Sequence, residues 1–511
     1  MRLARAAALI AGAYILSNLT GFVARILIAR LYGTGAEADA FRAAFQIPDL
    51  LFSLLAGGAL GSAFIPAYSG RLATGRPGAA RALLQRVAVL TTLGMGALAL
   101  LAALLAGPLA ARVVGVGFDP GSQALTAELM RIMLIGTVIF SLSGLLMGVL
   151  QSHDAYLAPA LAPAVYQLGL VLGATVFQPF GVRGLAYGVV VGALGHLAVQ
   201  IPALLRLPPA TPDGSTLAAD TRQVLRQMAP RTLGLGATRL NFVVNTRLAS
   251  AMAVGSVAVF DQAFAILVLP IAMAGQAVGT ALFPAISAAA ARGERAAFGA
   301  ALTRALGVVN AFALPAMVGL IALGEPLIRV LFEHGSFGPE STRLVAGALA
   351  WLSVGLLGHS ALEIVTRGFY ALRDSLRPAL LSVLSMVANI ALSLAFIMAF
   401  SIVGAPPIFA LGLANALATL GEALILVLLL RRQAEGFDTA RLLRGLAVSG
   451  LAALGMGLGL LAWRGVAGEG ALATLVALPL AAALYLGLAW LLRGEDALDA
   501  VRLVRQRVFK R

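Results

Sequence analysis

Residues 49–70 read DLLFSLLAGGALGSAFIPAYSG. The twenty-one residues 50–70 carry no charged side chain, and a helix of that length is enough to cross the hydrocarbon core of a bilayer. Three glycines and a proline interrupt the run, namely Gly57, Gly58, Gly61 and Pro66. A helix that only anchors a protein has no need of residues that loosen or bend it. The segment therefore indicates a membrane helix whose interruptions serve a purpose.

The composition places the whole chain in a membrane. It has 511 residues, of which 60% are hydrophobic and only 12% charged, and its mean hydropathy is +0.94. A soluble protein carries about 25% charged residues, so a soluble fold is excluded. The net charge of +15 lies mostly in short loops, where it predicts membrane topology rather than binding of nucleic acid. We therefore expect membrane lipids to surround the chain.

Apolar segments long enough to span a membrane recur along the chain. They are expected to be helices, because lipid satisfies no open backbone hydrogen bonds and barrel strands are much shorter. The predicted spans are 7–32, 40–68, 86–112, 124–150, 157–178, 182–206, 222–249, 254–284, 300–324, 342–368, 378–400, 408–430, 441–464 and 470–492. The sequence thus predicts an all-α polytopic membrane protein with fourteen transmembrane helices.

Basic residues set the predicted orientation, because they concentrate in cytoplasmic loops. With the N-terminus in the cytoplasm, the cytoplasmic loops and tail hold 26 of the 37 basic residues. The basic start and the apolar run after it resemble a signal peptide, but the run continues to Ile28 and more spans follow. We therefore expect an uncleaved first helix and both termini in the cytoplasm.

The sequence also contains an internal repeat. Residues 59–69, ALGSAFIPAYS, return as AVGTALFPAIS at 277–287, an offset of 218 residues and six predicted helices. A weaker echo relates the segment from Gly148 to Asp154 to the segment from Gly368 to Asp374. An even number of helices separates the copies, so the two halves share one orientation. Repeats of this kind are typical of alternating-access transporters.

The repeat predicts two pseudo-symmetric lobes of six helices each. The expected organisation is an N-lobe at 1–206, a cytoplasmic linker at 207–221, a C-lobe at 222–435, two further helices within 436–492 and a basic cytoplasmic tail at 493–511. Hinge or close-packing positions are expected in both copies, at Gly57, Gly58, Gly61, Pro66, Gly279 and Pro284.

Polar side chains inside the spans are the candidate site residues, because they are costly in lipid and face cavities or partners. The predicted cavity residues are Arg25, Asn18, Asp39, Arg239, Asn241, Asn245 and Asp261. Such a set predicts a water-filled cleft for an anionic headgroup such as a pyrophosphate. The alternative is that the arginines snorkel or pair with Asp39, Asp261 or Glu422, and that the asparagines only join helices.

No pattern indicates an enzyme. The four histidines are scattered, no cysteine is present, and no glycine-rich loop ends in Lys-Ser or Lys-Thr, so neither a metal site nor an ATP site is expected. No cofactor is predicted. The driving force is expected to be an ion gradient or the membrane potential, acting through Asp39, Asp261 or Glu422.

Taken together, the motifs resemble the MurJ/MviN family of lipid II flippases, in the multidrug/oligosaccharidyl-lipid/polysaccharide exporter superfamily. The similarity covers essentially the whole chain. It is carried by GFVARILIARLYGTGAEADAF (21–41), IPDLL (47–51), GALGSAFIPAY (58–68), APALAPAVYQ (158–167), LFEHGSF (331–337) and RGFYALRDSLRP (367–378). The resemblance implies fourteen helices and a central cationic cavity. It also implies export of an undecaprenyl-pyrophosphate-linked disaccharide-pentapeptide across the bacterial inner membrane. Nothing in the sequence requires a protein partner, and we expect a monomer.

The chain departs from the pattern of that family at several charged positions. Asp39 matches the acidic residue of its DAF motif, whereas Arg25 stands one position after the usual arginine. Uncharged residues occupy further positions where the family commonly has charge, namely Asn18, Ala24, Phe52, Ser53, Gly57 and Ala265. A lipid II flippase is the first expectation. A flippase for another lipid-linked oligosaccharide (Wzx-like), a cation-coupled multidrug exporter and a non-transporting scaffold for envelope assembly are the alternatives.

Overall fold

The computed structural model describes residues 2–54, 59–213, 222, 236, 239–497 and 499–500. Every regular element in these ranges is a helix. Eleven of the helices are long and apolar enough to cross a membrane, and a pair bent by 46° makes a twelfth if it counts as one span. The prediction of an all-helical polytopic membrane protein is confirmed. The predicted number of fourteen spans is not.

The two missing spans are those that run through residues outside the described ranges. The predicted span 40–68 contains residues 55–58, and the predicted span 222–249 is described only at 222, 236 and from 239 onward. The helix over 239–250 is the described end of the latter. Neither segment offers an uninterrupted apolar helix of 18 residues among the described residues, so neither is counted.

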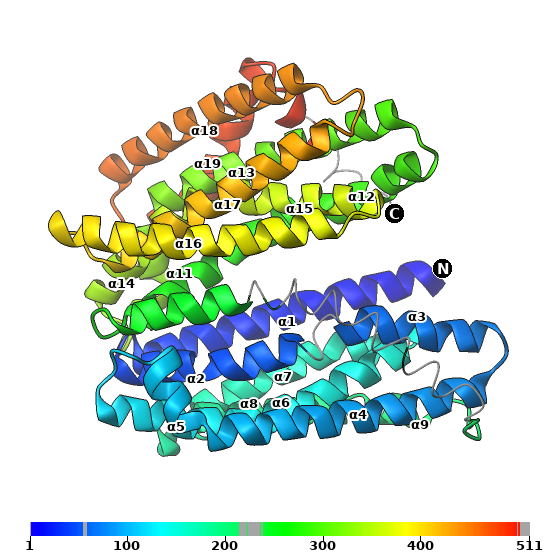
Figure 1. Cartoon of the computed structure of the whole chain (residues 1–511). Helices are drawn as coiled ribbons and strands as arrows, with labels where there is room; N and C mark the ends of the chain where they lie inside the picture. The colour runs from blue at the N-terminus through cyan, green and yellow to red at the C-terminus, as the bar shows by residue number, and fades with distance from the viewer. Residues whose placement is uncertain are drawn as a thin grey trace. The chain divides into compact units, whose positions relative to one another are not determined.

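Contacts divide the chain into two compact units. Unit 1 comprises Met1–Ala258 and His334–Phe337, and unit 2 comprises Val259–Glu333 and Gly338–Arg511. The long helices of unit 1 lie side by side (Figure 1). Besides the helix at 239–250, the described elements of unit 1 are α1 (Arg2–Tyr32), α2 (Ala36–Phe52), α3 (Ala59–Ala73), α4 (Pro77–Leu104), α5 (Ala106–Leu109), the π-helix η2 (Ala110–Val114), α6 (Pro120–Ser152), α7 (Leu157–Thr175), the 3-10 helix η3 (Gln178–Phe180), α8 (Val182–Ala198) and α9 (Ile201–Leu205).

Unit 2 is a second bundle, and its first helix begins at the end of unit 1. Its helices α13 and α18 pack along each other, as do α16 and α17 (Figure 1). Its elements are α11 (Ser256–Ile271), the π-helix η4 (Ala272–Gln276), α12 (Ala277–Ala291), α13 (Arg295–Phe332), α14 (Pro339–Ser353), α15 (Leu356–Ala371), α16 (Leu376–Ile402), α17 (Ile408–Arg431), α18 (Thr439–Ala467) and α19 (Ala471–Leu491).

π-helical residues precede each copy of the repeat. In the second copy, α11 passes through the π-helix η4 into α12, which contains Pro284. In the first copy, α2 is followed by π-helical residues at 53–54, and α3 contains Pro66. A π-helix leaves an i−4 hydrogen bond unmade and so allows a bend. π-helical residues therefore lie before the repeated segment in both halves, while residues 55–58 lie outside the described ranges.

The helices of unit 1 approach closely through glycines. A Cβ atom on Gly188 of α8 would lie 2.5 Å from the carbonyl oxygen of Gly169 in α7, and one on Gly173 would lie 2.9 Å from the carbonyl oxygen of Gly184. Small residues of this kind let membrane helices pack backbone to backbone. The glycines of α7 and α8 thus form a continuous seam.

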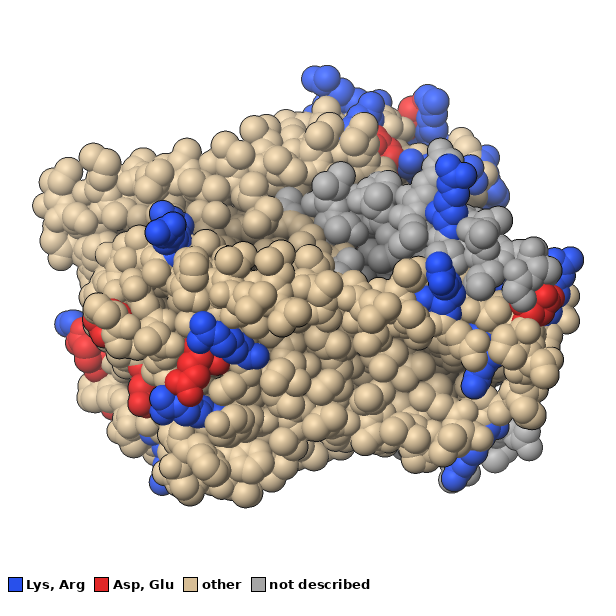
Figure 2. All heavy atoms as spheres, turned by 60° about the horizontal axis from the view of Figure 1, so that its bottom comes forward, with Lys and Arg blue, Asp and Glu red and all other residues tan. Residues whose placement is uncertain are grey.

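Large areas of the surface carry no charge, as expected of a membrane protein. In Figure 2 the charged side chains form separate groups, and wide areas between them are uncharged. On α4, the large side chains Leu93, Leu100 and Leu104 are 62–71% exposed. Exposed leucines in such a row are suited to contact with lipid chains rather than water.

Candidate functional site

Arg239 and Asp49 form an ion pair inside unit 1. Arg239 Nη1 lies 2.8 Å from Asp49 Oδ2, and the two side chains are 42% and 28% exposed. Asp49 lies near the end of α2, and Arg239 lies on the helix described over 239–250. An accessible pair of this kind is worth about 0–1 kcal/mol, so a ligand can separate it at little cost. The guanidinium is suited to hold an anionic phosphate oxygen.

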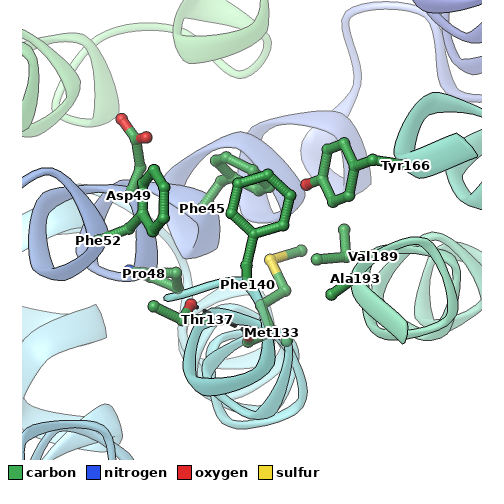
Figure 3. Close-up of a pocket in the computed structure, with 11 residues that line it drawn as sticks. Phe45, Pro48, Asp49, Phe52, Met133, Thr137, Phe140, Tyr166, Val189 and Ala193 are labelled. Atoms are coloured by element: carbon green, nitrogen blue, oxygen red, sulfur yellow. Dashed lines mark hydrogen bonds between the residues drawn. The ribbon is translucent and has the colours of Figure 1, made fainter. Parts of the chain in front are cut away.

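A pocket lies directly beside this pair. It is a cavity of about 210 Å³ formed by α2, α6, α7 and α8. Figure 3 shows the rings of Phe45, Phe52, Phe140 and Tyr166 around it, with the carboxylate of Asp49 at the edge of the group. The remaining lining residues are Pro48, Met133, Gly136, Thr137, Val189 and Ala193. Asp49 is the one ionisable acid among these residues.

Asp39, predicted to line the cavity and to couple ions, has a different environment. It is 3% exposed, and its carboxylate accepts hydrogen bonds from the backbone N–H groups of Gly255 at 2.6 Å and Ala258 at 2.7 Å. These N–H groups belong to the turn and first residues that open α11. The carboxylate thus caps a helix start and satisfies donors that would otherwise be buried without partners.

Two predicted asparagines have buried amide oxygens. Asn241 and Asn245 are four residues apart on the helix at 239–250, which places them on one face. The Oδ1 atom of each is buried and accepts no hydrogen bond from the described residues. Such oxygens are able to receive donors from a ligand or from water.

The other predicted site residues are spread over both units. Asn18 is exposed and Arg25 half-buried on α1 of unit 1. Asp261 of α11 and Glu422 of α17 belong to unit 2, where Glu422 accepts a hydrogen bond of 2.6 Å from Ser382 Oγ. The structure therefore gathers Arg239, Asn241 and Asn245 on one helix, and it leaves the remaining candidates on separate elements.

Arg239 does not form the ion pair that the sequence analysis considered for it. The alternatives there were Asp39, Asp261 and Glu422, whereas its partner is Asp49. Asp49 was missed as a partner because it stands at the boundary of the apolar run and was considered only as part of the IPDLL motif at 47–51. The available signal was its position on α2 one turn after Phe45 and beside Pro48.

Two glycines near the π-helix η4 lie close to side chains of α15, and one of them, Gly279, is among the predicted hinge or packing positions. A Cβ on Gly275 would lie 2.9 Å from Glu363 Cγ, and one on Gly279 would collide with the guanidinium of Arg367. Glu363 and Arg367 form an ion pair of 3.1 Å along α15. The two glycines therefore leave room for an ion pair next to the break at η4. In the first copy, Gly61 lies in α3, while Gly57 and Gly58 lie outside the described residues.

Comparison with known proteins gives consistent matches over most of the chain. A model of the family described as lipid II flippase MurJ matches residues 28–480. The chain is 30% identical over 392 residues to the lipid II flippase MurJ of Burkholderia cenocepacia, covering 75% of this chain and 76% of that protein. It is 29% identical over 510 residues to the probable lipid II flippase MurJ of Bdellovibrio bacteriovorus, covering 96% and 95%.

Solved structures show the same fold at lower identity. A structure described as lipid II flippase MurJ in an inward closed conformation superimposes with a TM-score of 0.79 and 22% identity, covering 94% of this chain and 98% of that chain. An inward-facing multidrug resistance MATE family transporter of the MOP superfamily gives a TM-score of 0.67 and 19% identity, covering 83% and 94%. The fold is therefore shared with both groups of transporters.

Proposed function

Because the chain belongs to the lipid II flippase MurJ family, we propose that it moves lipid II from the cytoplasmic to the outer leaflet of the bacterial inner membrane. The family match over residues 28–480 is the observation that carries this proposal. The family predicted from the sequence motifs is thus confirmed, and with it a transporter rather than an enzyme. The mechanism we propose is alternating access, which the internal sequence repeat and the π-helix before its second copy support.

We propose fourteen membrane helices, in two lobes of six followed by two more. The eleven spans and the bent pair account for twelve. We assign the other two to the segment that includes α2 and α3, whose residues 55–58 lie outside the described ranges, and to the helix that ends at 250, because both are apolar in sequence. An even number places both termini on the cytoplasmic side, where the basic loops belong. We propose that the protein functions as a monomer.

The proposed headgroup site is built around Arg239. Its guanidinium sits in an accessible ion pair, and the free amide oxygens of Asn241 and Asn245 lie on the same helix. In the proposal, the diphosphate of the cargo binds the guanidinium of Arg239 and replaces Asp49 as its ion-pair partner. Hydroxyl or amide groups of the cargo donate hydrogen bonds to Asn241 and Asn245. Asn18 and Arg25 are proposed to complete the site. Asp39, Asp261 and Glu422 remain proposed ion-coupling groups for an ion gradient or the membrane potential.

A flippase for another lipid-linked oligosaccharide is the second candidate. The observation that favours it is Phe52, which lines an aromatic pocket at a position where the resemblance leads us to expect charge. A site with fewer charges and more rings suits a cargo with a different saccharide. An assay that compares the two lipid-linked cargoes at equal concentration separates these candidates.

The proposed function is tested by depletion and complementation. Depletion in the host is expected to stop cell-wall synthesis and to trap lipid II in the inner leaflet, and the wild-type chain is expected to restore both. Arg239→Ala and Arg25→Ala are expected to fail, with at least a tenfold loss of translocation rate. Arg183→Ala is the matched control, because Arg183 forms an exposed ion pair with Glu128. Normal lipid II translocation after depletion rules the proposal out.

A further inference from the structure

The aromatic pocket of unit 1 has the lining of a site for a small organic cation. We propose that it binds an alkylammonium or quaternary ammonium group, with the charged nitrogen between the rings and facing Asp49. This binding site goes beyond the proposed flippase activity and does not depend on it.

The rings form a connected cage. Phe140 stands in the middle, with its centroid 5.0 Å from that of Phe52 and 5.0 Å from that of Tyr166, at interplanar angles of 67° and 58°. Phe45 adds a fourth ring to the lining (Figure 3). Ring faces carry negative potential, so several rings around one cavity attract a cation placed between them.

A buried polar network packs against Phe140 of the cage. The ring of His196 lies 4.4 Å from that of Phe140. His196 Nδ1 is 2.7 Å from Ser143 Oγ, which also accepts a hydrogen bond of 2.7 Å from Gln200 Nε2. These groups fix the position of Phe140 and hence the width of the cavity. A cage that is already formed loses little entropy when it binds.

The charges at the pocket favour a cation over an anion. Asp49 lines the pocket, whereas its ion-pair partner Arg239 does not. The hydroxyl of Thr137 is engaged by the carbonyl oxygen of Met133 at 3.2 Å. An anion would therefore meet aromatic rings and be repelled by the carboxylate of Asp49, whereas a cation would be attracted by that carboxylate. Opening the exposed Arg239–Asp49 pair to admit it costs little.

The size of the pocket limits the ligand. A volume of about 210 Å³ is below the roughly 300–1,000 Å³ of sites for drug-sized ligands. The pocket thus fits a compact ammonium group with a short apolar body. It does not fit a large polycyclic drug.

The test uses two probes of the same shape, choline and 3,3-dimethylbutan-1-ol, which differ in the charged nitrogen. Binding to the full chain in neutral detergent is followed by saturation-transfer NMR of the probe methyl groups. We expect choline to bind at least fivefold more tightly than the neutral alcohol, as cation–π attraction and one carboxylate provide. Equal binding of the two probes shows an apolar pocket only and overturns the proposal.

Substitutions at the pocket are expected to change the affinity for choline in opposite directions. Asp49→Asn and Phe140→Leu are expected to weaken choline binding at least fivefold, whereas Arg239→Gln is expected to strengthen it at least threefold by releasing Asp49. The matched controls are Glu128→Gln, in an exposed pair with Arg183, and Phe180→Leu, on an exposed ring outside the pocket. Choline affinity that stays unchanged in Asp49→Asn, with the variant folded as judged by its melting temperature, overturns the proposal.

Discussion

At the level of single residues, Asp39 and Asp49 show two ways in which a membrane helix accommodates a carboxylate. Asp39 is buried and accepts hydrogen bonds from backbone N–H groups at the start of α11. Asp49 is accessible and faces a guanidinium. Both arrangements offset the cost of charge in an apolar environment, but only the second leaves the carboxylate within reach of a ligand.

Replacement of Asp39 is predicted to destabilise the fold. Asp39→Ala leaves two buried N–H groups without acceptors, at a cost of about 1–3 kcal/mol for each. Asp119→Ala is the comparison, because Asp119 caps α6 at an exposed position through the N–H groups of Gly121 and Ser122, and its loss costs about 1 kcal/mol. Melting temperatures in detergent measure both. A loss in Asp39→Ala no larger than that in Asp119→Ala contradicts the assigned role.

Asp496, which lies after the last membrane helix, is predicted to make stability depend on pH. Burial raises the pKa of its carboxyl group, and nearby Arg441 offsets part of the effect. The folded state therefore holds this proton more tightly than the unfolded state. The resulting stabilisation is present below the unfolded pKa of about 3.8 and is lost as the pH rises through the raised folded pKa.

The corresponding variant is Asp496→Asn. It is expected to melt at a higher temperature than the wild type at pH 8, and the difference is expected to shrink as the pH falls toward 4. Asp438→Asn is the control, because Asp438 is exposed and caps α18 through the N–H group of Arg441. A constant difference between Asp496→Asn and wild type across this pH range would show that burial of the charge is not the cause.

At the level of elements, the seam between α7 and α8 depends on glycines. Gly188→Ala forces a Cβ to within 2.5 Å of the carbonyl oxygen of Gly169, so the helices must separate, at a cost of about 1–3 kcal/mol. Gly94→Ala on α4 is the matched control, because nothing lies within 4 Å of its added Cβ, and alanine favours the helix by about 1 kcal/mol. The melting temperature is therefore expected to fall in Gly188→Ala and to rise in Gly94→Ala. A shift of Gly188→Ala in the same direction as Gly94→Ala contradicts the seam.

The π-helical interruptions show which features of the helices can be predicted from the sequence. The repeat at 59–69 and 277–287 predicted that both halves share one feature, and the structure places a π-helical break before each copy. The reason for the glycines was not predictable. Gly275 and Gly279 accommodate Glu363 and Arg367, which lie on α15 and come close only in the folded bundle.

The candidate site shows which of its residues can be predicted from the sequence and which cannot. Arg239, Asn241 and Asn245 are recognisable from sequence, because polar groups on one helix stripe within an apolar segment are unusual. Their partners come from other helices. Neither Asp49 nor the ring cage around Phe140 follows from local spacing, since α2, α6 and α7 contribute to it from distant parts of the chain.

At the level of the whole molecule, the topology with both termini in the cytoplasm is directly testable. The chain has no cysteine, so single cysteines can be introduced without a background. Arg5→Cys and Arg505→Cys are expected to react with an impermeant maleimide only after the inner membrane is opened. Asp119→Cys, in a loop on the opposite side, is expected to react without that treatment. Labelling of Arg505→Cys from outside indicates an odd number of spans and contradicts the proposed fourteen.

The most direct test of the account is translocation of lipid II by the purified chain in proteoliposomes. Fluorescent lipid II in the inner leaflet becomes accessible to an impermeant quencher only when it is flipped. We predict rapid translocation by the wild-type chain, at least a tenfold slower rate for Arg239→Ala, and a wild-type rate for Arg183→Ala. Translocation no faster than in empty liposomes would contradict the proposed function, and a wild-type rate for Arg239→Ala would contradict the proposed site.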